Sequence, residues 1–320
     1  MNDVWKAMLW RSPEYIPVSV GILPRAWMKY REALRNLVAK HQAIFGSPSG
    51  PRDFDAVPGT YTEGEHVDVW GCVWSNIAQG RESIVTGHPV PTREDIRKLK
   101  VPDEDAGFPH GFMFLRLTDL RGFEECMLDF AEEPPELQLM IDIVLEYNLR
   151  QARNLLARIE SPQIVYFGDD LGMQNALPIS PEKWRKYLKP CFQAIYEPFK
   201  RAGCYIYMHT DGHIVEIIPD LIDCGVDILN PQFRANGLDS LVQACKGKVC
   251  VDLDLDRQLF PFASRDEIDS HVRESVEKLG SPEGGLMLKA EIDDQLSLET
   301  MDAIMDALER HRAHYRLPET

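Results

Sequence analysis

The chain has 320 residues, of which 44% are hydrophobic and 27% charged, a composition typical of a globular protein with a large core. Its formal net charge of -16 at pH 7 argues against sequence-independent binding to nucleic acid or to an anionic membrane surface, because both need clustered Lys and Arg. The seven cysteines are scattered and form no CxxC pair, which indicates a reducing compartment. We therefore expect a cytoplasmic protein without a signal peptide or a membrane span.

The first 110 residues form the least regular part of the chain. We expect a short strand, a helix that ends near Gly46, a hairpin or extended excursion rich in Val, Trp and Ile, and a short helix bounded by prolines. In chain order these elements are residues 18–22, 25–45, 66–90 and 91–103.

From residue 111 onward, short apolar runs alternate with amphipathic helical segments. The predicted strands are residues 111–117, 164–168, 204–208, 226–230, 248–255 and 284–291. The predicted helices are residues 135–159, 181–203, 213–224, 238–246, 265–279 and 298–311. This alternation predicts parallel strands joined by helical crossovers, and a (β/α)8 TIM barrel with an N-terminal extension, formed as one domain over residues 1–320. An open doubly wound sheet is the alternative, but no GxGxxG motif supports a dinucleotide fold.

Polar side chains follow the predicted strands at their carboxyl ends, which in a barrel meet at the rim where active sites lie. The candidates are Asp169, Asp170, His209, Asp211, Asn230, Gln232, Asp252 and Glu291. Of these, Asn230, Gln232 and Asp252 are predicted to contact substrate.

His209 and Asp211 are two residues apart, so in an extended segment their side chains point to the same side. Both could bind one metal ion, with Glu291 from the last strand as the third ligand. A His/Asp/Glu set suits zinc or a harder divalent ion. The alternative is a metal-free site, in which His209 is a neutral hydrogen-bonding group and Asp211 caps the following helix.

Asp169 and Asp170 are adjacent, so one could point into the barrel while the other holds the loop. Two carboxylates near one site can raise one pKa and provide a general acid or base, and we predict catalytic roles for Asp169, Asp170 and His209. The alternative for the aspartates is a solvated turn.

Asp252, Asp254 and Asp256 alternate with apolar residues and therefore share one face, which predicts exposure and a functional role for at most one of them. The other histidines, His110 among them, have no partner at a ligand spacing. Surface or loop positions are more typical for them.

Several segments resemble the uroporphyrinogen decarboxylase superfamily, in the order that the family has them. They are residues 68–103, 166–190, 208–232, 284–292 and 296–307. The resemblance implies a (β/α)8 barrel. The decarboxylase branch carries an arginine-rich RQAGR-type motif, but here the corresponding region has only Arg25 and Arg31.

The corrinoid-dependent methyltransferase branch of the superfamily has a zinc site of the form His-x-Cys with a later Cys. His209 matches its first position, whereas Asp211 and Glu291 stand where the cysteines would be. The resemblance implies a methyltransferase that moves a methyl group between a small methylated substrate and a corrinoid on a partner protein, since the chain shows no cobalamin-binding segment. A carboxy-lyase like uroporphyrinogen decarboxylase and a non-catalytic binding barrel are the alternatives, and the sequence leaves a homodimer open.

Overall fold

The structure is a computed structural model that describes residues 1–47 and 50–316. The chain forms two compact units. The first unit holds residues 1–64, 76–83 and 231–320, and the second holds residues 65–75 and 84–230. The single domain predicted over residues 1–320 stays a prediction.

Six parallel strands follow one another in the order β1-β9-β8-β7-β6-β5. Along the chain they are β1 (Val18–Ile22), β5 (Ile164–Gly168), β6 (Tyr205–Thr210), β7 (Val226–Pro231), β8 (Cys250–Asp254) and β9 (Leu286–Ile292). The predicted α/β class and all of these strands are confirmed. In the described part of the chain these strands form a six-stranded parallel sheet, and the closed eight-stranded barrel stays a prediction.

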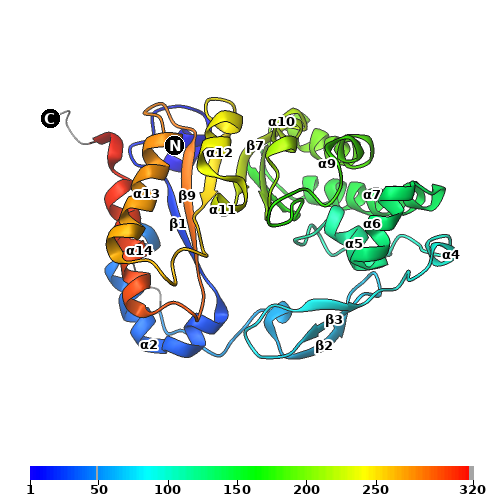
Figure 1. Cartoon of the computed structure of the whole chain (residues 1–320), viewed down its shortest axis with the longest axis horizontal. Helices are drawn as coiled ribbons and strands as arrows, with labels where there is room; N and C mark the ends of the chain where they lie inside the picture. The colour runs from blue at the N-terminus through cyan, green and yellow to red at the C-terminus, as the bar shows by residue number, and fades with distance from the viewer. Residues whose placement is uncertain (48–49, 317–320) are drawn as a thin grey trace. The chain divides into compact units, whose positions relative to one another are not determined.

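The first unit packs helices beside β1, β8 and β9 (Figure 1). They are α1 (Asp3–Met8), α2 (Pro24–Lys40), α3 (Gln42–Phe45), α11 (Phe233–Asn236), α12 (Leu238–Cys245), α13 (Arg265–Leu279) and α14 (Leu298–His311), with 3-10 turns at η1 (Gly59–Tyr61) and η4 (His314–Arg316). Ser264 and Glu267 form a capping box at the start of α13, which sets the beginning of this helix. The single helix predicted over residues 25–45 is wrong, because His41 adopts φ -96° and ψ 56° and separates α2 from α3.

The second unit covers β5 and β6 with long helices. Its helices are α4 (Arg93–Ile96), α5 (Phe114–Arg121), α6 (Phe123–Glu132), α7 (Pro135–Leu156), α8 (Pro181–Lys183), the π-helical turn η2 (Trp184–Leu188), α9 (Lys189–Arg201), the 3-10 turn η3 (Val215–Ile217) and α10 (Ile218–Asp223). The strand predicted over residues 111–117 is wrong, because α5 begins there at Phe114. A short apolar run does not distinguish a buried strand from a buried helix.

A separate three-stranded sheet, in which β3 and β4 pair antiparallel, confirms the hairpin predicted over residues 66–90. Its strands are β2 (Gly64–Val67), β3 (Val73–Asn76) and β4 (Ile84–Gly87). Among the described residues, no helix has both the length and the apolar composition to cross a membrane.

His271 of α13 lies in the core of the first unit, where its Nε2 accepts a hydrogen bond from the Asp256 amide at 3.2 Å. Burial lowers the pKa of His271 to about 4, although the nearby carboxylates of Asp256 and Glu274 favour the charged form. The ring is therefore neutral in the folded protein at pH 7.

Lowering the pH from about 6.5 to about 4 is expected to weaken the folded state through His271. The unfolded chain takes up a proton at about pH 6.5 and the folded chain only near pH 4, so the unfolded state binds more protons in this window. The free energy of unfolding then falls by up to about 3 kcal/mol as the pH falls through it. Denaturant unfolding measures this slope, and His271→Gln, which keeps an acceptor, is expected to remove it. An NMR titration of the folded His271 ring near pH 6.5 would contradict the expectation.

Candidate functional site

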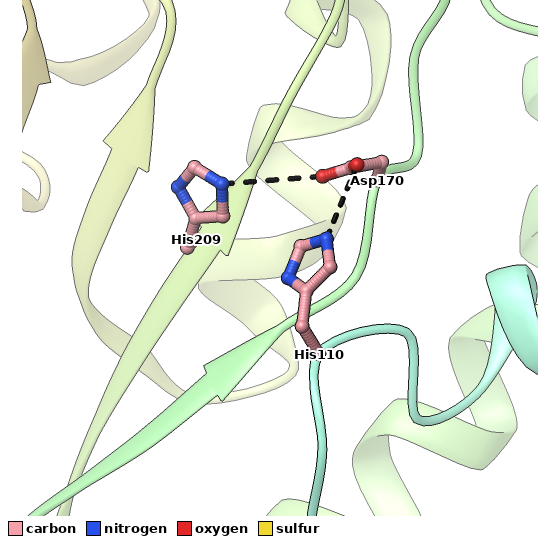
Figure 2. A group of neighbouring side chains, drawn as sticks. All are labelled: His110, Asp170 and His209. Atoms are coloured by element: carbon pink, nitrogen blue, oxygen red, sulfur yellow. Dashed lines mark ion pairs between the residues drawn. The ribbon is translucent and has the colours of Figure 1, made fainter. Parts of the chain in front are cut away.

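Three side chains that could hold a metal ion meet in the second unit, near the carboxyl ends of β5 and β6 (Figure 2). Asp170 follows β5, His209 lies in β6, and His110 comes from the loop before α5. Each offers one ligand atom, and these atoms lie within 4.8 Å of one another. Asp170 Oδ2 is 3.1 Å from His110 Nε2, and Asp170 Oδ1 is 4.0 Å from His209 Nε2. We call these three residues the His110 group.

Gly168 makes room for this arrangement. It is the residue of β5 paired with His209 in the sheet register. A Cβ atom built on Gly168 would lie 2.5 Å from His110 Nδ1, a distance that real Cβ contacts do not reach. The missing side chain at Gly168 therefore lets the His110 imidazole lie against the strand beside His209.

Gly168→Ala is expected to displace the His110 ring and to weaken metal binding by about tenfold or more, while the fold persists. The substitution adds one methyl group where only His110 stands in the way. Metal titration by calorimetry measures the affinity. Gly203→Ala is a control for the loss of a glycine, because a Cβ there meets no atom within 4 Å, although its positive φ adds backbone strain. Equal affinity of Gly168→Ala and the wild type would show that His110 is not a ligand.

The orientation of His209 is fixed by Asn230 at the end of β7. His209 Nδ1 lies 2.7 Å from Asn230 Oδ1. Because an amide oxygen only accepts hydrogen bonds, Nδ1 is the donor. In neutral His209 the lone pair is then on Nε2, which lies toward Asp170 and 3.3 Å from Asp211 Oδ1. Histidine ligands of metals are commonly fixed through their second nitrogen in this way.

The carboxylates around His110 favour a cation at this position. Partial burial disfavours the charged imidazole, but the hydrogen bond and charge of Asp170 outweigh it, with further help from Asp169 and Asp211, and raise the pKa of His110 to about 9. The His110 and His209 rings lie 5.5 Å apart between centroids. A metal ion bound here would neutralise the negative charge of these carboxylates in place of the His110 proton, which would be released.

Asp169 lies behind the site and holds the start of α5. It is fully buried, and its carboxylate accepts hydrogen bonds from the amides of Met113 (3.2 Å), Phe114 (2.5 Å) and Leu115 (2.9 Å). Burial raises its pKa to about 7, while these amides favour the charged form. The contacts are those of a helix cap, so of the two adjacent aspartates it is Asp170 that belongs to the His110 group.

The loops that carry Asp170 and Asp211 touch through two glycines. A Cβ on Gly212 would lie 2.2 Å from the Gly172 backbone, and one on Gly172 would lie 2.4 Å from the His213 backbone. Gly212 also has φ +84°, which favours glycine. The two backbones are joined by hydrogen bonds from the Gly172 amide to Asp211 and from the His213 amide to Met173.

The remaining predicted site residues belong to the first unit. The Glu291 carboxylate pairs with Arg257 at 2.5 Å, and the Gln232 backbone carbonyl accepts a hydrogen bond from Asn236. Asp252 is 8% exposed. The ligand role of Glu291 and the substrate-binding roles of Gln232 and Asp252 stay predictions.

The exposure predicted for Asp252, Asp254 and Asp256 is wrong, since all three are buried. Asp254 pairs with Arg257 at 2.7 Å, and Asp256 pairs with Arg234 at 2.7 Å. An arginine partner offsets the cost of burying a carboxylate, and such a partner cannot be found from the alternation of apolar and acidic residues alone.

The sequence prediction missed His110. This histidine lies more than 50 residues before Asp170 in a loop without ligand spacing. Gly168 is the local sequence signal that could have indicated a neighbour at this position, since a glycine inside an apolar strand often marks the close approach of another group.

This geometry defines a class of protein. It is an α/β protein that carries possible metal ligands at the carboxyl ends of parallel strands. The family model for uroporphyrinogen decarboxylase (URO-D) matches residues 113–311, more than half of the chain. The chain therefore belongs to the URO-D family, as the resemblance in the sequence implies.

One solved structure supports the fold, and a second is similar to the chain at a lower score. A methyltransferase from Methanosarcina mazei is 18% identical, with a TM-score of 0.63 over 96% of this chain and 97% of that one. A B12-independent methionine synthase from Shewanella sp. W3-18-1 is 14% identical, with a TM-score of 0.49 over 94% of this chain and 98% of that one. No curated protein matches the chain.

Proposed function

We propose that this chain is a metal-dependent methyltransferase of the URO-D family. The observation that carries the proposal is the His110 group, two histidines and one carboxylate gathered at the end of β5 and β6. Two nitrogens and one oxygen form a ligand set that zinc accepts, with a further position left for a substrate. The likeness in fold to a methyltransferase adds support.

In this proposal His110, Asp170 and His209 hold the metal. When bound, the metal would supply Lewis acidity, which stabilises the negative charge left on the substrate atom that gives up the methyl. Asn230 keeps His209 in the tautomer that ligates through Nε2. Asp211 lies 3.3 Å from His209 Nε2 and would orient or deprotonate a substrate group.

The ligand set differs from a thiolate site. The His110 group contains no cysteine, and burial raises the pKa of Cys72, Cys191 and Cys224 to about 12. Oxygen and nitrogen ligands leave a bound metal harder than thiolates do. We therefore propose a harder methylated group than a thioether as the substrate, such as a methoxyl or methylamine compound.

An aromatic surface beside the His110 group would receive such a substrate. Tyr207 precedes His209 by two residues in β6, so both side chains lie on one face of the sheet. Its ring lies 4.8 Å from that of Tyr166, which is 63% exposed. Tyrosine faces suit a methyl group that carries partial or full positive charge.

The methyl group would pass to a corrinoid protein, the partner that the sequence resemblance implies. Purified chain is incubated with a methylated small molecule and a reduced corrinoid protein, and the absorbance of the corrinoid reports methylation. We expect methylation that depends on both the substrate and the chain. Turnover of uroporphyrinogen instead would support the carboxy-lyase. Binding of a small molecule without turnover of any substrate would support a non-catalytic binding barrel.

A further inference from the structure

A second set of metal-type ligands lies in the first unit, where the chain turns between α2 and α3. His41 occupies this turn and is 3% exposed. Asp302 and Asp306 of α14 face it, and one ligand atom from each of the three residues lies within 4.8 Å of the others. We propose that these residues, the His41 cluster, bind a divalent cation separately from the His110 group.

The helical spacing of α14 gathers the carboxylates. Residues four apart on a helix lie on the same face, so Asp302 and Asp306 are neighbours, and Glu309 follows one turn later. His41 Nε2 lies 3.3 Å from Asp302 Oδ1, and His41 Nδ1 lies 3.2 Å from Glu309 Oε2. Two segments that are far apart in the sequence thus bring nitrogen and oxygen ligands to one place.

The charges of the cluster are not balanced by its protein partners. Arg265 of α13 pairs with Asp302 at 2.8 Å and with Asp306 at 2.5 Å. Three carboxylates, counting Glu309, and one guanidinium leave an excess of two negative charges before the His41 ring is counted. A divalent cation neutralises this charge, which is otherwise costly beside a buried ring.

The buried ring itself points to a missing ligand. Within the residues that the structure describes, His41 Nδ1 has no hydrogen-bond partner, although Glu309 is close. Buried polar atoms normally have such a partner, and a metal held by Nδ1 together with Glu309 would supply it, while Nε2 keeps its hydrogen bond to Asp302. A groove of about 300 Å³ between α13 and α14, which Arg265, Asp306 and Arg310 help to line, opens Asp306 to solvent.

One imidazole with carboxylate oxygens is a ligand set for zinc or manganese. A cation here would join the α2–α3 turn to α14 and stabilise the first unit. It has no part in the reaction proposed for the His110 group, and it needs only the residues of the His41 cluster.

The test uses full-length His209→Ala, which removes a ligand of the His110 group and leaves the His41 cluster intact. After equilibrium dialysis against Zn²⁺ or Mn²⁺, bound metal is counted by mass spectrometry. We expect one equivalent in His209→Ala and none in the double variant with His41→Gln. No specific metal in His209→Ala would overturn the inference. One equivalent in both the wild type and His209→Ala would refute the catalytic metal and leave this inference standing.

A second variant tests the inference in case His41→Gln does not fold. Asp306 has a 41% exposed side chain, so Asp306→Asn is expected to fold and to bind the metal at least about tenfold more weakly. Asp269→Asn is the matched control, because Asp269 lines the same groove but pairs with Arg310 and His311. Equal metal affinity of Asp306→Asn and Asp269→Asn would contradict ligation by Asp306 and overturn the inference.

Discussion

His209→Ala is expected to abolish methyl transfer, with a loss of at least about 10³-fold in kcat/KM. The substitution removes Nε2, the atom that lies near both Asp170 and Asp211. The electrostatic stabilisation that a bound metal supplies is worth several kcal/mol, and about 4 kcal/mol corresponds to this factor. Steady-state kinetics and the metal content of the purified variant are measured together.

His213→Ala is the matched control for this experiment. His213 lies in the loop that follows β6, but its Nε2 pairs with Glu216 at 3.0 Å, outside the His110 group. We expect near wild-type metal content for the His110 group in this variant. Full activity of His209→Ala would refute the metal-dependent proposal.

Asp169→Ala is expected to destabilise the second unit by about 3 kcal/mol or more. Its carboxylate accepts three backbone amides at the start of α5, and without it these buried donors lose their partner. Each buried unsatisfied donor costs about 1–3 kcal/mol, part of which is recovered because a buried charge disappears. Denaturant unfolding at equilibrium measures the change.

Two variants complete this experiment. Asp169→Asn keeps one acceptor oxygen in place and is expected to cost less than the alanine variant. Asp142→Ala removes an exposed carboxylate of α7 that accepts a hydrogen bond from Gln138, and is expected to change the free energy of unfolding by less than about 0.5 kcal/mol. Equal stability of Asp169→Ala and Asp142→Ala would mean that the cap is not needed.

The same aspartate shows how far the sequence could predict the fold. The strand ending at Gly168 was predictable, because a five-residue apolar run followed by two aspartates is typical of a buried parallel strand. The helix at Phe114 was not, since it begins where the Asp169 carboxylate, 55 residues later, accepts its first amides. Tertiary contacts decided between helix and strand where the local pattern allowed both.

Part of the candidate site could also be predicted from the sequence. Asp170 and His209 lie at strand ends, where parallel topology concentrates polar groups. His110 was not predictable, because a loop residue reaches the site only through the space that Gly168 leaves. The break at His41 was likewise hidden inside a segment with continuous helical composition.

The contact between Gly172 and Gly212 has a consequence for the cost of binding. Because the two loop backbones touch and are joined by hydrogen bonds, neither can move far without the other. Fixing a mobile loop residue costs about 1–2 kcal/mol of conformational entropy, and here folding has already met that cost for both loops. A ligand that contacts Asp170 or Asp211 therefore binds preorganised loops, and less of its interaction energy is lost to ordering them. Its binding free energy is more favourable as a result.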